Sequence, residues 1–283
     1  MATFFNQASL SYNGNVTQSN ITVGEIVGVL TASKDALTTV YASGDKVTYV
    51  IALVNSGATA LSGLTVSDNL GAYPFGTLTL RPLDYVDGSL RYYVNGVLQA
   101  SPTVTANDQL VISGISIPPS SNALLVYETT VNSFAPLDAQ SQITNVATIG
   151  GDGVNDVTVS ETINASDASS LTVTKAVNPT VVSENGRITY TFVIQNYGNT
   201  ASGIADNAVL SDTFNPVLSD ITVSYNGNAW VEGVNYTYNA STGEFSTVDG
   251  QITVDAASYV QDPTTGEWSV VPSSAVITVS GNI

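Results

Sequence analysis

Two segments far apart in the chain alternate strictly between apolar and polar positions, and they share one pattern. Their apolar faces consist of Phe4, Asn6, Ala8 and Leu10 in the first segment and of Ile143, Asn145, Ala147 and Ile149 in the second. A period of two residues predicts a half-buried β-strand. Each segment therefore predicts a strand that carries one asparagine on its apolar face.

An internal repeat covers nearly the whole chain. Residues 47–57 align with residues 188–198, and Lys34 and Lys175 stand at the same separation along the sequence. A long, constant separation is the mark of a duplicated structural unit. We therefore expect two copies of one domain.

Each copy consists of short alternating segments divided by turn residues. Asn-Gly dipeptides at residues 95–96 and 226–227 are strong hairpin signals. The strands expected in the first copy cover residues 30–36, 47–55, 64–70, 90–98, 110–117, 124–131 and 143–149, and the second copy opens with a strand at 171–177. About seven short strands in this order are typical of an immunoglobulin-like sandwich. The predicted fold is all-β, with two tandem immunoglobulin-like β-sandwich domains.

The order of the strands predicts that the second sandwich lacks its last strand. In the first copy, residues 143–149 follow the Pro-Ser-Ser turn at 119–121 and the strand at 124–131. The second copy repeats this turn at 272–274 and the strand at 275–280, and no equivalent of residues 143–149 follows. We expect residues 1–12, which carry the matching pattern, to act as a donor strand that closes the second domain of a neighbouring copy.

This interpretation divides the chain into four parts. They are a donor strand and connector at residues 1–28, a first sandwich at 29–150, a connector at 151–170 and a second sandwich at 171–283.

Composition narrows the possible functions. The net charge is −17 with only six lysine and arginine residues, and such a chain repels nucleic acid and anionic membrane. There is no cysteine and no histidine, which removes disulfides, thiol catalysis, Cys/His metal sites and the usual general base. We expect no enzyme, no cofactor and no bound metal. A glycosidase with a pair of carboxylates is the remaining enzymatic alternative.

The motifs follow one another in the same order in both copies. The first copy reads as a strand with Lys34, then Gly-Asp-Lys-Val-Thr-Tyr at 44–49, Asn-Ser-Gly at 55–57, Ser-Asp-Asn-Leu at 67–70 and Thr-Asn-Val-Ala-Thr at 144–148. This order resembles the conserved-repeat-domain family (domain of unknown function eleven) of bacterial surface proteins. A two-repeat chain also looks like the spore-appendage subunits of anaerobic spore-formers. The resemblance implies β-sandwich modules with a structural role.

Charged residues recur on faces that should be apolar. Alternation places Lys34 and Asp68 inward in the first copy, and Lys175 and Asp212 inward in the second. Burial favours the neutral forms of Lys and Asp. A neutral amine can attack an asparagine side chain whose carbonyl an acid polarises, and ammonia then leaves. Asn145 would complete such a set, which resembles the self-forming Lys–Asn isopeptide bonds of immunoglobulin-like bacterial surface domains.

Two interpretations of these residues remain. In the first, an isopeptide bond joins Lys34 to Asn145 within a domain, and a second joins Lys175 to Asn6 of another subunit beside Asp212. In the second, the Lys–Asp pairs are ordinary buried ion pairs and the asparagines satisfy backbone groups.

The function predicted from these patterns is that of a structural subunit of an extracellular or spore-surface filament, with other copies of itself as partners. The subunits would polymerise head to tail. The alternative is a monomeric surface adhesin or stalk module that binds a glycan through an aromatic segment, with candidate residues Trp230, Tyr236, Tyr238, Phe245, Tyr259 and Trp268.

Overall fold

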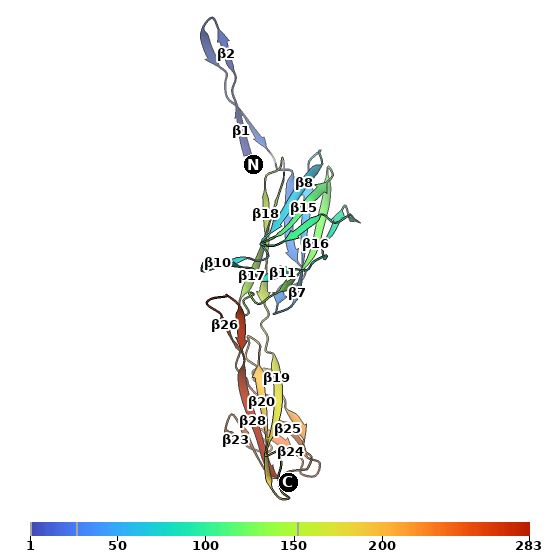
Figure 1. Ribbon diagram of the computed structural model, residues 1–283, viewed down its shortest axis with the longest axis vertical. Coiled ribbons are helices and arrows are strands. Elements are labelled where there is room, and N and C mark those ends of the chain that lie inside the picture. Colours follow the sequence, from blue (N-terminus) through green and yellow to red (C-terminus); the bar gives the residue numbers. More distant parts are fainter. Residues whose placement is uncertain (1, 27, 152) are drawn as a thin grey trace. The chain divides into compact units, whose positions relative to one another are not determined.

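The computed structural model describes residues 2–26, 28–151 and 153–283. The chain forms two compact units, of which unit 1 comprises residues 1–39, 44–132 and 143–163 and unit 2 comprises residues 40–43, 133–142 and 164–283. Strands make up nearly all of the regular structure (Figure 1), and the single helical element of the described residues is a short 3-10 helix, η1 (Ile204–Asp206). The all-β prediction is therefore confirmed.

The first sandwich consists of two facing sheets. One sheet has the order β13-β12-β16-β7-β5, with β11 also paired to β16. Its strands are β5 (Leu30–Ala36), β7 (Lys46–Asn55), β11 (Leu83–Tyr85), β12 (Arg91–Val94), β13 (Val97–Leu98) and β16 (Ser121–Val131). The other sheet has the order β14-β15-β8-β17-β18-β6. Its strands are β6 (Val40–Tyr41), β8 (Leu61–Asp68), β14 (Thr103–Ala106), β15 (Leu110–Ile117), β17 (Gln142–Gly150) and β18 (Val157–Ala165), and a separate ribbon pairs β9 (Tyr73–Phe75) with β10 (Leu78–Leu80).

Alternation along the strands builds the core between these sheets. Every second residue of β7, from Val47 to Leu53, is buried, and the same holds along β16 from Ala123 to Val131. Inward side chains from both sheets fill the space between them, as expected for a sandwich. The segment that we expected to be a connector also holds β18, which pairs with β17.

The second sandwich repeats five of the six strands of the first sheet and only part of the second sheet. Its larger sheet has the order β19-β20-β28-β22-β23, which matches β5-β7-β16-β12-β13 strand for strand. Its smaller sheet, β21-β25-β24, matches β8-β15-β14. The strands are β19 (Leu171–Asn178), β20 (Arg187–Asn196), β21 (Ser211–Thr213), β22 (Ser219–Tyr225), β23 (Asn228–Trp230), β24 (Tyr236–Tyr238), β25 (Glu244–Thr247) and β28 (Ser273–Asn282), with a separate hairpin of β26 (Ser258–Gln261) and β27 (Trp268–Val271).

One buried asparagine recurs at the same place in both sandwiches. The side chain of Asn55, at the end of β7, donates to the carbonyls of Thr59, Ile117 and Pro118 and accepts from the Gly57 N–H. Asn196, at the end of β20, makes a similar set of bonds: its side chain donates to two loop carbonyls, those of Thr200 and Asp255, and accepts from the N–H groups of Gly198 and Ser170. The Asn-x-Gly motif of the sequence is therefore a repeated hydrogen-bonded turn, which supports the duplication.

The N-terminal segment is a two-stranded extension. The strands β1 (Ala2–Asn6) and β4 (Thr22–Ile26) pair antiparallel, as do β2 (Ser9–Tyr12) and β3 (Asn15–Gln18). The turn between β2 and β3 is Asn13-Gly14, whose φ angles of 45° and 80° are those of a type I′ hairpin. The expected donor strand is thus interrupted at residues 7–8 and already has a partner strand. We name residues 2–26 the N-terminal hairpin.

Candidate functional site

The predicted lysine and aspartate of the first sandwich meet inside its core. Lys34 projects from β5 and Asp68 from the end of β8, and Lys34 Nζ lies 2.6 Å from Asp68 Oδ2. Both side chains are completely buried. The alternation of the two strands therefore placed both charges on the inward face, as the sequence predicted.

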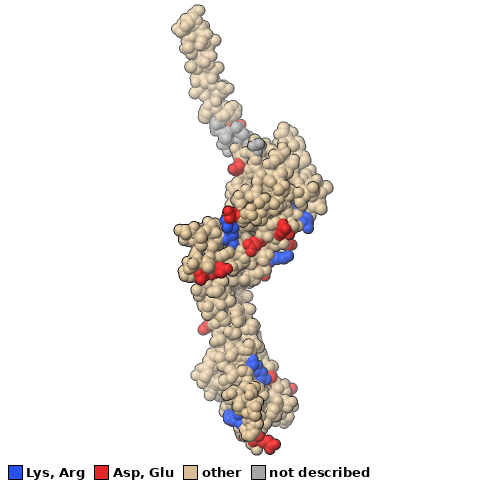
Figure 2. Space-filling model, viewed as in Figure 1, with Lys and Arg blue, Asp and Glu red and all other residues tan. Residues whose placement is uncertain are grey.

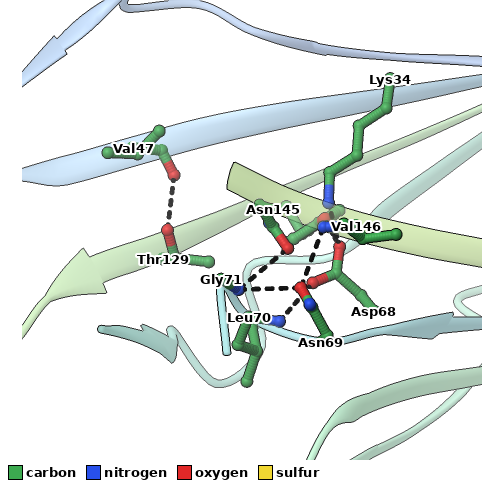
Figure 3. Close-up of polar contacts among 10 residues, drawn as sticks. Lys34, Val47, Asp68, Asn69, Leu70, Gly71, Thr129, Asn145 and Val146 are labelled. Carbon is green, nitrogen blue, oxygen red and sulfur yellow. Dashed lines mark hydrogen bonds and ion pairs between the residues drawn. The ribbon is translucent and has the colours of Figure 1, made fainter. Parts of the chain in front are cut away.

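Asn145 completes the predicted set from the strand next to β8. Ala147, two residues after Asn145 on β17, pairs with Asp68 of β8. Asn145 and Ala147 face the same side of the sheet, so the Asn145 side chain lies in the core close to Asp68. The Asn145 side chain is fully buried, and its Oδ1 accepts a hydrogen bond of 3.2 Å from the Gly71 N–H. Its Nδ2 has no hydrogen-bond partner among the described residues. Figure 3 shows Lys34 and Asp68 pointing toward each other beside Asn145.

Gly71 is shaped for this contact. Its φ of +72° disfavours other residues, and a Cβ at this position would lie 2.6 Å from the Ile143 side chain. The Gly71 N–H is shared with the Asn69 side chain, whose Oδ1 lies 3.0 Å away. A backbone N–H directed at a side-chain carbonyl stabilises negative charge that develops on that oxygen.

Tyr127 is a member of the site that the sequence analysis missed. It lies on β16, is fully buried, and donates its hydroxyl hydrogen to Asp68 Oδ2. Burial, followed by the negative charge of Asp68, raises the pKa of Tyr127 well above its ordinary value. A buried tyrosine normally needs a hydrogen-bond partner for its hydroxyl. The inward position of Tyr127 on its strand, together with the inward Asp68, was the sequence signal that could have identified Tyr127 as part of the site.

Burial also acts on the lysine. Desolvation lowers the pKa of Lys34, while the charge and the hydrogen bond of Asp68 oppose this shift. The direction follows from the removal of water around an ammonium group. Lowering the pKa increases the fraction of neutral amine, which is the nucleophilic form.

The first sandwich buries the groups that an acyl transfer would require in one layer of its core. Lys34 supplies an amine, Asp68 can take up and return a proton, and the Asn145 amide accepts a backbone hydrogen bond at its carbonyl oxygen. The amide nitrogen, which would leave as ammonia, makes no regular hydrogen bond to a described residue, although the Asn145 side chain lies close enough to the Tyr127 hydroxyl to oppose the rise in the Tyr127 pKa.

Replacing Tyr127 by phenylalanine should lower the free energy of unfolding by about 1–3 kcal/mol, because Asp68 loses a buried donor. The folded-state pKa of Tyr127 is raised above 10.0. Its contribution to stability is therefore present below pH 10.0 and is lost as the pH rises through the folded pKa. Urea unfolding across this range should show a steeper alkaline loss for the unsubstituted protein than for Tyr127→Phe. Tyr12→Phe, an exposed control, should keep the steep slope, and equal slopes in all three proteins would refute this role of Tyr127.

The second predicted set is only partly assembled within unit 2. Lys175 from β19 forms an ion pair with Asp212 from β21, and its Nζ lies 4.5 Å from the centre of the Tyr190 ring. The side chains of Lys175 and Asp212 are 41% and 19% exposed, whereas those of Lys34 and Asp68 are completely buried. The third member, Asn6, lies on β1 in unit 1, where it pairs with Thr22.

An uncovered apolar groove adjoins the Lys175–Asp212 pair. Every residue of β19 is exposed, and Val173 on its inward-facing side is 53% exposed. A hollow of about 140 Å³ lies between β19 and residues 208–210; its lining residues are Leu171, Thr172, Val173, Ile194, Ala208, Val209, Leu210 and Ile252. In the smaller sheet, β21 is an edge strand among the described residues. The second sandwich is therefore open at the place that β17 fills in the first.

The aromatic residues of the glycan-binding alternative do not form one exposed platform. Tyr236 and Phe245 are buried, with ring centres 5.5 Å apart, and both belong to the core of unit 2. Trp230 stacks on Tyr225 at 5.0 Å. These contacts are cross-strand packing, which leaves fewer rings for a ligand.

The described residues contain no cluster of three or more acidic, histidine or cysteine side chains suited to a metal ion. In the part of the chain that the structure describes, no helix is long enough and apolar enough to cross a membrane.

Comparison with known proteins finds matches among solved structures only. No family model and no curated protein matches the sequence. The pilus backbone RrgB of Streptococcus pneumoniae is 14% identical, with 86% of this chain and 55% of that chain covered and a TM-score of 0.35. The major pilin BcpA of Bacillus cereus is 10% identical, with 96% and 73% covered and a TM-score of 0.36. The collagen-binding subdomain of the Enterococcus faecalis surface protein ACE is 8% identical, with 50% and 99% covered and a TM-score of 0.30. The chain thus spans about half the length of the first of these pilins.

Proposed function

We propose that this protein is the structural subunit of an extracellular or spore-surface filament. One observation carries the proposal. The two sandwiches have equivalent Lys–Asp pairs, but the side chains of the pair are completely buried in the first sandwich and partly exposed to solvent in the second. In the first sandwich the covering strand is β17, which brings Asn145 to the pair. A strand with the pattern of β17 is present at residues 4–10.

The proposed contact between subunits is the insertion of this N-terminal strand into the second sandwich of the next copy. The inward residues of the inserted strand would occupy the positions that β17 fills in the first sandwich. The matched pairs are Phe4 with Ile143, Asn6 with Asn145, Ala8 with Ala147 and Leu10 with Ile149. In this register Asn6 faces Lys175 and Asp212. An exposed edge strand and an apolar groove are the surfaces that strand addition uses.

This contact joins different surfaces of identical subunits. Such a heterologous contact continues from one copy to the next and produces an open filament when the rotation does not close a ring. The proposal accounts for the exposed side chains Phe4 and Leu10, which are 52% and 62% exposed in the single chain. These residues would be buried after insertion.

We further propose that an isopeptide bond forms in each set of lysine, aspartate and asparagine, one within the first sandwich and one between subunits. In the first sandwich, Lys34 Nζ attacks Asn145 Cγ with Asp68 carrying the proton, so that a C–N bond to Nζ forms and the bond to Nδ2 breaks. Ammonia leaves, and no oxidant or other reactant is needed. Between subunits, Lys175 would react in the same way with Asn6 of the next copy beside Asp212.

Assembly should depend on the inward face of the N-terminal strand. Purified monomer should polymerise as its concentration rises, and Leu10→Asp should raise the concentration required at least about 100-fold, because an unpaired buried carboxylate costs several kcal/mol. Light scattering and negative-stain images would measure this. Ser9→Asp, on the outward face of the same strand, is the matched control and should assemble normally. Filaments from a protein that lacks residues 1–12 would refute the proposal.

A further inference from the structure

Two neighbouring long strands of the first sandwich have no counterpart among the described residues of the second. The first sandwich has the sheet β14-β15-β8-β17-β18-β6, while the second has β24-β25-β21 and, among its described residues, no counterpart of β17, of β18 or of the two-residue strand β6. The larger sheets of both sandwiches agree along their five-strand path, and only β11, at the side of β16, has no counterpart among the described residues. Among the described residues of the second sandwich, the two long strands β17 and β18 are therefore both without a counterpart.

The N-terminal hairpin has the form of the missing pair. In the first sandwich, β17 and β18 are adjacent, and the hydroxyl contacts of Thr144 with Thr162 and of Thr148 with Thr158 show that they run antiparallel. The N-terminal hairpin likewise joins a first arm, residues 2–12, to an antiparallel second arm, residues 15–26.

The sequence of the second arm also corresponds to β18. Val16-Thr17 matches Val157-Thr158, and Ser19 matches Ser160 at the same separation as the repeat. Both hairpins turn through a glycine at positive φ, which is 80° at Gly14 and 82° at Gly153. The duplication therefore extends over both arms.

We infer that the donated element is the whole N-terminal hairpin, which enters the second sandwich of another copy as a preformed pair of strands. This inference rests on the proposed function and specifies what is exchanged. The first arm would lie beside β21, as β17 lies beside β8, and the second arm would cover the outer edge of the first. A lone donor strand would instead leave its own edge unpaired, which is the liability that β18 removes in the first sandwich.

The surface of the hairpin suits contact with another copy of this chain. Residues 2–24 contain no charged side chain, and Figure 2 shows the visible face of this segment as uncharged along nearly all of its length. The chain has a net charge of −17, so that copies repel each other at long range. An uncharged donor adds nothing to this repulsion when it is buried.

The two arms of the hairpin also hold each other in place. The Phe4 ring lies over Gly24 on the opposite strand, where an added Cβ would come within 2.3 Å of the ring. Thr22 Oγ1 donates to the Asn6 carbonyl at 3.2 Å. The first arm therefore presents Asn6 from a paired strand, which reduces the ordering required on binding.

Hydrogen–deuterium exchange on the unsubstituted chain tests this inference. Exchange of amides in residues 15–26 should slow at least about tenfold on going from monomer to filament, together with that of residues 4–12. Protection confined to residues 4–12 would overturn the hairpin inference and leave strand insertion intact. Filaments without protection in either arm would overturn both, and so would a chain that never assembles.

A disulfide lock provides a second test in a chain without cysteine. Ser11 and Val16 stand opposite each other in the N-terminal hairpin, so Ser11→Cys combined with Val16→Cys should join the arms on oxidation. The oxidised protein should assemble as readily as the reduced protein if the hairpin enters intact. Assembly only after reduction would show that the arms separate, and this would overturn the inference.

Discussion

The purified monomer should have an intact mass about 17 Da below the mass of its sequence, because one molecule of ammonia leaves when Lys34 Nζ displaces the Asn145 amide. Lys34→Met and Asn145→Ala should each restore the full mass. The site that supports this expectation is buried, holds Lys34 against Asp68 at 2.6 Å, and directs the Gly71 N–H to the Asn145 carbonyl. Mass spectrometry of the denatured protein measures the outcome directly.

The two substitutions should differ in stability. Asn145→Ala removes the crosslink and keeps the Lys34–Asp68 pair, so the free energy of unfolding should fall by about 4–5 kcal/mol, the value for a link that closes a loop of about 100 residues. Lys34→Met also strands a buried carboxylate, which costs roughly a further 3–5 kcal/mol. The expected order of thermal stability is therefore unsubstituted protein, then Asn145→Ala, then Lys34→Met.

Lys46→Met is the matched control for these measurements. Lys46 pairs with Glu128 at 3.2 Å, but its side chain is 64% exposed. Exposed pairs of this kind contribute about 0–1 kcal/mol. The control should keep the mass deficit and nearly all of the stability, whereas an unsubstituted protein of full sequence mass would show that the first set is an ordinary buried ion pair.

Boiled filaments should separate in a denaturing gel as a ladder of multiples of the subunit, because a peptide-like bond between Lys175 and Asn6 survives heat and detergent. Lys175→Met and Asn6→Ala should each reduce the ladder to a single monomer band. Both variants should still form fibres by strand pairing alone. Lys34→Met should keep the ladder, since its bond lies within one subunit.

The exposure of the second set explains why this bond should form only in the polymer. Water reaches Lys175 in the single chain, since its side chain is 41% exposed. Insertion of the donor would exclude that water and bring the amide to the Lys175–Asp212 pair at the same time. A ladder from the Asn6→Ala protein would contradict the assignment, and a monomer band from intact unsubstituted filaments would show that strand pairing alone holds them.

Local patterns predicted those features of the fold that depend on one strand at a time. Alternation placed Lys34 and Asp68 inward, and each Asn-Gly dipeptide in a hairpin adopts positive φ at both residues, as at Asn95 and Gly96. These outcomes need only the two-residue period of a strand and the steric freedom of the turn.

Features that depend on several strands were missed. Tyr127 comes to Asp68 from the opposite sheet, and the Gly71 N–H reaches Asn145 through a turn, so neither contact leaves a mark in the spacing of residues. The sequence analysis placed the second arm of the N-terminal hairpin in the connector of residues 1–28, because its pattern of mixed polar residues carries little periodic signal. Only the structure shows that β17 pairs with β18, and this pair is what the N-terminal hairpin resembles.

The placement of Lys34 on the first strand of its sandwich and of Asn145 near the end of the domain determines how a tensile load would pass through it. Lys34 lies on β5 and Asn145 on β17, in opposite sheets. With these side chains bonded, a pull on the two ends of the domain runs from β5 directly to β17. The strands between these two residues, from β7 to β16, would carry none of the force and should stay folded until a covalent bond breaks, whereas β18, which follows Asn145, would remain under load.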